Sequence, residues 1–150
     1  MKKIIVTSLF LILLLASCNN VIEEAEEEIN LLDPIEVELN MKSQLVVDDE
    51  MVTEAIITQK GEPVTDANEV VFEIWQHGNP DSYQLLEGFN EGKGAYEVSW
   101  TARDVGVYYI YYHVTARGMH RMEKHQFVVG DVDVDKVLET PDERPQKHMH

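Results

Sequence analysis

Imidazole and thioether side chains gather within residues 113–125, which read HVTARGMHRMEKH. If residues 117–118 form a two-residue hairpin turn, His113 lies opposite Met122, and His120 lies on the same face beside them. Opposite residues of paired antiparallel strands have Cβ atoms about 5 Å apart. Two imidazoles with a thioether favour copper, especially Cu(I), because sulfur is a soft ligand and this set lacks the carboxylates that harder ions prefer.

A longer turn would shift the strand register by one residue. His113 would then lie on the side of Met119 and His125, a different set of the same ligand types. Each residue also has a purely structural interpretation. His113 would be a surface histidine, the methionines would fill the end of a core, and His125 would be solvated among charged neighbours.

Three further histidines lie outside this stretch. His77 precedes a Gly-Asn-Pro sequence and is interpreted as a turn residue. His148 and His150 end the chain on either side of Met149. They could bind metal through a flexible tail, although an isolated His-x-His pair is weaker evidence than a cluster.

The sequence contains no pattern that indicates a particular enzymatic reaction. It contains no nucleophile with an identifiable base, no phosphate-binding glycine loop and no carboxylate pair in an apolar setting. We therefore predict a binding protein rather than an enzyme. The net charge of −16 argues against nucleic-acid binding, which depends on cationic side chains.

The N-terminus is typical of a secreted lipoprotein. Residues 1–17 have two lysines followed by a short apolar run, the pattern of a signal peptide. The run ends in Leu-Ala-Ser before Cys18, the only cysteine of the chain and the predicted site of lipid attachment. Several acyl chains on one cysteine give stable anchoring. These features predict a protein on the outer face of a cell membrane.

Composition divides the rest of the chain into three parts. Residues 18–33 contain a run of glutamates, which repel one another and predict an extended acidic linker or stalk. Residues 34–130 form one predicted domain. Residues 131–150 are polar, contain two prolines and predict a mostly disordered tail.

The domain shows the two-residue hydrophobic period of half-buried strands. Turn sequences rich in Gly, Pro and Asn separate the apolar runs. We predict an all-β fold, an immunoglobulin-like antiparallel β-sandwich of about seven strands. The expected strands are 35–41, 51–58, 70–75, 83–86, 96–100, 107–116 and 122–129.

A short motif sharpens this fold prediction. Residues 104–108 have the form Asp-x-Gly-x-Tyr, the spacing of a tyrosine corner, in which the phenol of Tyr108 bonds back to the backbone. Ile110 stands where an antibody domain has a disulfide cysteine. A sandwich without that disulfide is therefore expected.

The stretch 113–122, with Phe-Val-Val-Gly at 127–130, resembles the YtkA-like (also FixH-like) family of small extracytoplasmic proteins. Residues 60–67 (KGEPVTDA) and 73–75 (EIW) are similar to the same family, as is the layout of anchor, stalk and single domain. The sequence departs from the family at Glu123, where a proline is frequent, which puts the loop geometry there in question.

The resemblance implies an immunoglobulin-like sandwich outside the cytoplasmic membrane of a Gram-positive bacterium. It also implies copper handling during assembly of a respiratory cytochrome oxidase, with an oxidase subunit or a copper chaperone as partner. The implied ligands are His113, Met119, His120 and Met122, and residues 120–122 are also similar to the His-x-Met element of periplasmic copper chaperones. The alternative is a metal-free docking module that presents Tyr109 and Tyr111 to a membrane or cell-wall protein.

Overall fold

The computed structural model describes residues 33–143, which form ten strands and one short helix. Seven of the strands match the seven predicted ones in place. The other three, β2, β4 and β7, are two to four residues long and too short to show a hydrophobic period. The elements are β1 (Ile35–Asn40), β2 (Gln44–Leu45), β3 (Glu50–Gln59), β4 (Glu62–Pro63), β5 (Glu69–Gln76), β6 (Asn79–Glu87), β7 (Phe89–Gly92), β8 (Ala95–Thr101), β9 (Gly106–Ala116), β10 (Met119–Val129) and α2 (Val134–Leu138).

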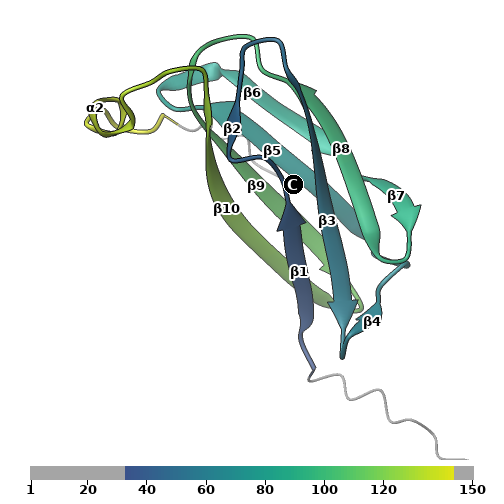
Figure 1. Ribbon diagram of the computed structural model, residues 1–150. Coiled ribbons are helices and arrows are strands. Elements are labelled where there is room, and N and C mark those ends of the chain that lie inside the picture. Colours follow the sequence, from purple (N-terminus) through teal and green to yellow (C-terminus); the bar gives the residue numbers. More distant parts are fainter. Residues whose placement is uncertain (1–32, 144–150) are drawn as a thin grey trace, which may run out of the picture. The chain divides into compact units, whose positions relative to one another are not determined.

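The strands form two sheets that face each other (Figure 1). Sheet A has the order β1-β3-β8-β7, with β4 paired to β3, and sheet B has the order β2-β10-β9-β5-β6. All pairings are antiparallel except that of β2 with β10. The predicted immunoglobulin-like β-sandwich is confirmed, with ten strands in the described residues rather than seven.

The core lies between the sheets because alternate side chains of each strand point inward. On β9 the inward set includes Tyr108, Ile110 and Tyr112, and on β5 it includes Phe72 and Ile74; all are buried. The intervening residues of these strands point to the outer face of sheet B. These outward-pointing residues of β5, β9 and β10 form the outer face of sheet B.

The tyrosine corner is present. The hydroxyl of Tyr108 donates a hydrogen bond to the carbonyl oxygen of Asp104 at 2.9 Å. Its ring stacks on Phe127 and lies 5.2 Å from Trp100 between ring centroids. Burial raises the pKa of Tyr108, with a further contribution from the Asp104 carboxylate, so the phenol is held as a neutral donor.

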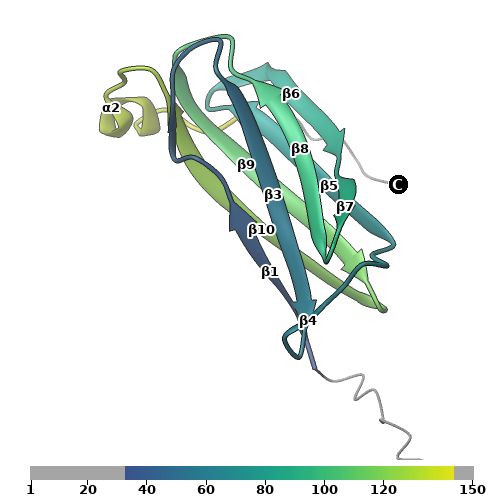
Figure 2. The ribbon, with the colours of Figure 1, turned by 45° about the vertical axis from the view of Figure 1, so that its right-hand side comes forward.

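The segment after β10 differs from the predicted disordered tail. Residues 131–143, which we call the strap, contain α2, and the Asp133 side chain caps this helix by accepting from the backbone N–H of Lys136. Val132, Val134 and Val137 pack against a second apolar cluster on the outer face of sheet B. Figure 2 shows α2 at the end of the sandwich opposite the β9–β10 turn. The composition of the strap is polar overall, so it did not indicate that these three valines would pack against the sheet.

Several predictions concern parts of the chain outside the described residues. The signal peptide, Cys18 and most of the acidic linker fall in 1–32, and His148 and His150 fall in 144–150. Within 33–143, the one helix is too short to cross a membrane.

Replacing Tyr108 with Phe removes the corner hydrogen bond and leaves the ring packing in place. We expect the free energy of unfolding in urea to fall by about 1 kcal/mol. Tyr112→Phe is the matched control, because its hydroxyl reaches Glu123 only at 3.4 Å, beyond the usual hydrogen-bond range. Equal losses in the two variants would contradict a special role for the corner.

Candidate functional site

The β9–β10 turn sets the geometry of the candidate site. Arg117 and Gly118 have φ angles of 52° and 74°, the positive values that a two-residue type I′ hairpin turn requires. The resulting register pairs His113 with Met122 and Thr115 with His120. The two-residue turn is confirmed, and the longer turn with its shifted register is wrong.

Arg117 also ties this turn to the other sheet. Its guanidinium donates to the Oε1 atom of Gln59 on β3 at 2.6 Å and lies 3.5 Å from the carboxylate of Asp66. The turn is therefore anchored at its tip, and the side chains of β9 and β10 next to it are held in a defined register.

His113, on the outer face of β9, is buried. Its Nε2 atom lies 2.8 Å from the Oε1 atom of Glu73 on β5, and both side chains are less than a twentieth exposed. A carboxylate in this position fixes the tautomer and orientation of an imidazole. The interpretation of His113 as a surface histidine is wrong, and the expectation of a site without a carboxylate needs correction, because Glu73 lies directly against the ring.

His120 and Met122 lie beside His113 and face solvent. The ring centroids of His113 and His120 are 5.9 Å apart, and the Nδ1 atom of His120 is 2.9 Å from the hydroxyl of Thr115. Met122 is 52% exposed. Two imidazoles and a thioether therefore meet on one face, one imidazole buried and the other two groups accessible.

Tyr111 links these groups. Its hydroxyl donates to the sulfur of Met122 at 2.7 Å, and its ring lies 4.6 Å from that of His113 between centroids. These contacts restrict the rotamers of both neighbours. The methionine is thus positioned by the sheet and does not simply fill a gap.

Two other candidate ligands point the opposite way. Met119 pairs with Ala116 and packs against the core between the sheets, so its place in the predicted ligand set is wrong. His125 stacks on Tyr112, whose ring is part of that core, and lies 3.6 Å from Glu123. Strand alternation separates both residues from His120 and Met122.

The structure adds two residues that the spacing of histidines and methionines did not reveal. Glu73 supports His113, and Tyr111 supports Met122. A signal for Glu73 was present, because it is the one carboxylate inside the apolar run 70–75. A charged residue between apolar neighbours on a central strand needs a partner, but the sequence does not say which residue supplies it.

The strap covers the same outer face further along the strands. The carboxylate of Asp142 accepts a hydrogen bond from the indole of Trp75 at 3.0 Å and lies 4.0 Å from the ammonium of Lys124. His77, predicted as a simple turn residue, joins this contact: one ring nitrogen is 2.9 Å from the hydroxyl of Tyr109 and the other 2.8 Å from the carbonyl oxygen of Thr140. The strap is therefore held by polar contacts as well as by its valines.

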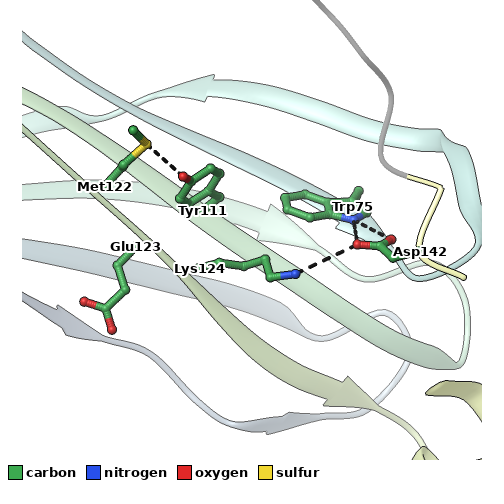
Figure 3. A pocket seen from close by; sticks show the side chains of 6 residues that line it. All are labelled: Trp75, Tyr111, Met122, Glu123, Lys124 and Asp142. Carbon is green, nitrogen blue, oxygen red and sulfur yellow. Dashed lines mark hydrogen bonds and ion pairs between the residues drawn. The ribbon is translucent and has the colours of Figure 1, made fainter.

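A pocket of about 320 Å³ lies between the strap and the candidate ligands. Figure 3 shows Met122 and Tyr111 at one end and Trp75 and Asp142 at the other, with the Lys124 side chain extending toward Asp142. Glu123 points away from the other side chains in this view. One continuous surface thus connects the exposed thioether with the end of the strap.

Asp142 of the strap contributes to a raised pKa of the Tyr109 phenol. Burial raises the pKa of this phenol, and the carboxylate of Asp142 raises it further because a nearby negative charge disfavours the phenolate. The ammonium of Lys124 lies 4.3 Å from the centre of the same ring, in a cation–π position.

The donor set can be tested for fit to one metal ion. An imidazole bound through nitrogen at about 2 Å places its ring centroid about 3 Å from the metal. Two rings with centroids 5.9 Å apart can therefore share an ion only if it lies almost on the line between them, and His113 would use its Nδ1 atom because its Nε2 atom faces Glu73. Within residues 33–143 no three side chains of the His, Cys, Asp and Glu types are grouped to hold a metal, so this set relies on the sulfur of Met122 as its third donor.

The chain belongs to the YtkA-like family, whose model matches residues 30–113. This match confirms the family predicted from the sequence. It includes residues 60–67 and 73–75, and it ends at His113, so His120 and Met122 lie beyond it. No protein of curated function matches the chain.

Several solved structures are similar at low identity. An engineered protein matches with a TM-score of 0.49 and 12% identity over 63% of this chain, which spans only 20% of that protein. A superoxide reductase (neelaredoxin) from Ignicoccus hospitalis matches with a TM-score of 0.43 and 10% identity, over 64% of this chain and 80% of that one. A CARDB domain from Pyrococcus furiosus, in complex with di-metal ions, matches with a TM-score of 0.42 and 12% identity, over 65% and 89%.

Replacing Glu73 with Leu leaves a buried imidazole without its carboxylate. We expect the free energy of unfolding to fall by about 3 kcal/mol, the usual cost of removing one partner of a buried pair. The double variant Glu73→Leu/His113→Leu removes both polar groups and should recover most of that loss. Additive losses in a double-mutant cycle measured by urea unfolding would contradict direct coupling between the two residues.

Replacing Asp142 with Asn removes the negative charge beside Tyr109. We expect the pKa of Tyr109 to move down toward its ordinary value, because only burial then disfavours the phenolate. The measurement is a pH titration of phenolate absorbance, with Tyr109→Phe identifying the signal. Glu143→Gln is the control, and an equal shift in that variant would indicate a general charge effect instead of the strap contact.

Proposed function

We propose that this chain is a lipid-anchored, extracytoplasmic copper-binding accessory protein that acts in assembly of a respiratory cytochrome oxidase. The observation that carries the proposal is the grouping of His113, His120 and Met122 on the outer face of the β9–β10 hairpin. The role proposed is binding and transfer of the metal, without catalysis of a reaction. The copper ion is cargo in this role.

The chemistry of the donors favours Cu(I). Thioether sulfur is a soft ligand that selects Cu(I) over harder ions, and imidazole binds copper well. The nearby carboxylate of Glu73 contacts the His113 ring at 2.8 Å, the type of outer contact that orients metal-binding histidines and raises their basicity. Glu73 is thus assigned a positioning role.

Accessibility supports transfer. His120 is exposed and Met122 is 52% exposed, so a partner protein can approach two of the three donors. His113, at the bottom of the site, is buried. Such an arrangement lets a partner replace the outer ligands one at a time while the inner one still holds the ion.

The cellular setting rests on the sequence. A signal peptide and lipid attachment at Cys18 would hold the domain at the outer face of the membrane of a Gram-positive bacterium. Tethering raises the effective concentration of the domain near membrane-embedded oxidase subunits or a copper chaperone. A modest affinity for the partner would then suffice.

A metal-free docking module is the second candidate. The surface predicted for docking, which carries Tyr109 and Tyr111, is small in the structure. The strap buries Tyr109, and Tyr111 is partly buried. Sheet A offers a different surface, since Phe89 on β7 is 70% exposed and Val52 on β3 is 47% exposed. Loss of partner capture in Phe89→Ser, in a chain that binds no copper, would favour this second function.

Titration with Cu(I) against a competing chelator tests the copper proposal. The full-length chain should carry Cys18→Ser, because the single thiol would otherwise bind copper itself. We expect one ion per chain with a micromolar or tighter Kd, and a loss of about tenfold or more in His120→Ala and in Met122→Leu, since each removes one of three donors.

Matched substitutions on the same strand supply the controls. His125→Ala and Met119→Leu remove the same donor types from the opposite face of β10, so we expect unchanged affinity. If His120→Ala and Met122→Leu also bind copper unchanged, the outer-face site is not the copper site and the proposal fails.

A further inference from the structure

β10 forms an edge of sheet B over most of its length. Its partner on one side is β9, and on the other side β2 pairs only with Val128 and Val129. Within residues 33–143 no strand pairs with residues 119–127 along this second side, which we call the free edge. Residues 120–124 are all exposed, and Figure 1 shows β10 along one side of the sandwich. An exposed strand edge of this length can pair with a strand of another chain.

The backbone hydrogen bonds of β10 show which residues face the free edge. The N–H group of Val128 donates to the carbonyl oxygen of Ser43 at 3.1 Å, and that of Gly130 donates to the carbonyl oxygen of Leu45 at 2.8 Å. The register with β9 is unbroken over residues 119–129. Because the backbone groups of successive residues point to alternate sides, the even-numbered residues direct their N–H and C=O groups to the free edge. These residues are His120, Met122, Lys124 and Gln126.

Two side chains of opposite charge lie two residues apart on this edge. Arg121 and Glu123 are exposed and point toward the inner side of the sheet, because they alternate with the outward-pointing His120 and Met122. Arg121 has no ion pair within the described residues. Inward-pointing charges at a sheet edge normally oppose pairing with another chain. A copy of this same strand, running antiparallel, can instead present a carboxylate to the cation and a cation to the carboxylate.

One register of such a pair fits both the charges and the available space. Centred on Met122, it places Arg121 of each copy opposite Glu123 of the other, and opposite charges on facing strands attract. Moving the centre by one residue would set Glu123 against Glu123 or Arg121 against Arg121. In the register centred on Met122, the turn at residues 117–118 of one copy lies opposite residues 126–127 of the other. The second strand therefore fills the free edge and ends just before β2 begins its pairing at Val128.

We infer that a second copy of this chain binds along the free edge of β10 and forms a two-fold symmetric dimer with Met122 on the axis. The two copies join their B sheets into one continuous antiparallel sheet. Three facing pairs of even-numbered residues supply about six backbone hydrogen bonds. The interface is isologous and closed, because each copy uses the same residues.

The dimer brings the two candidate copper sites together. Opposite residues of paired strands point to the same face, so the Met122 side chains of the two copies meet on the outer face, with Cβ atoms about 5 Å apart. Each site then has a second thioether beside it, while His120 and Met122 can still be approached from the outer face. This consequence rests on the proposed copper function, whereas the pairing of the strands does not.

Analytical ultracentrifugation of metal-free, full-length chains that carry Cys18→Ser tests the pairing. We expect the parent to form a reversible dimer. Arg121→Glu and Glu123→Arg should each weaken dimerisation by about tenfold or more, because each sets like charges opposite each other at two places. The double variant Arg121→Glu/Glu123→Arg should recover the affinity of the parent. Glu87→Arg is the control, since it reverses a charge on β6 at the opposite edge of sheet B and should leave dimerisation unchanged.

A mixture of the two single variants tests the register directly. The Arg121→Glu chain presents two carboxylates and the Glu123→Arg chain two cations, so an equal mixture should form heterodimers although neither chain dimerises well alone. A parent that stays monomeric overturns the inference and leaves the free edge to a strand of a different protein. A dimer that both single variants leave unchanged uses another surface and also overturns it. Neither result alters the Cu(I) titration of His120→Ala, so the proposed function is tested separately.

Discussion

The register of the β9–β10 hairpin is the constraint on which the candidate site depends. Because Arg117 and Gly118 adopt positive φ angles, the strands pair so that His113, His120 and Met122 emerge on one face. A shift of one residue would exchange this set for Met119 and His125, which pack on the core side. Arg117 reinforces the register through its bond to Gln59 of the opposite sheet. The contact of Tyr111 on β9 with Met122 on β10 would not survive such a shift.

Features set by local sequence could be predicted, and features set by long-range packing could not. The alternating apolar pattern, the tyrosine corner and the Arg-Gly turn act over a few residues, so seven strands, Tyr108 and the pairing of His113 with Met122 were all expected. Met119 was assigned to the ligand set by resemblance, although alternation along one strand places it on the opposite face from His120. Glu73 is forty residues from His113 in the chain, and no pattern in either segment identifies the other as its partner.

The strap is also held in place by long-range packing, which the sequence did not predict. Its charged residues predicted disorder, yet Val132, Val134 and Val137 are spaced to contact the cluster formed by Trp75 and Tyr109. These two aromatic residues lie on the outer face of sheet B, where a sandwich usually meets water, and their exposure without the strap would leave an apolar patch. Covering them gives the strap a structural reason to stay in place, and its polar end at Asp142 then lies next to the pocket that contains Met122.

Membership in the YtkA-like family establishes the kind of domain, and function depends on the site. The central claim is that copper binds through the imidazoles and the thioether on the outer face. X-ray absorption spectroscopy of the Cu(I)-loaded full-length chain, with Cys18→Ser, tests this directly, because it separates sulfur from nitrogen ligands. The account predicts a sulfur shell that disappears in Met122→Leu and remains in Met119→Leu. A ligand shell without sulfur, or one that Met122→Leu leaves unchanged, would contradict it.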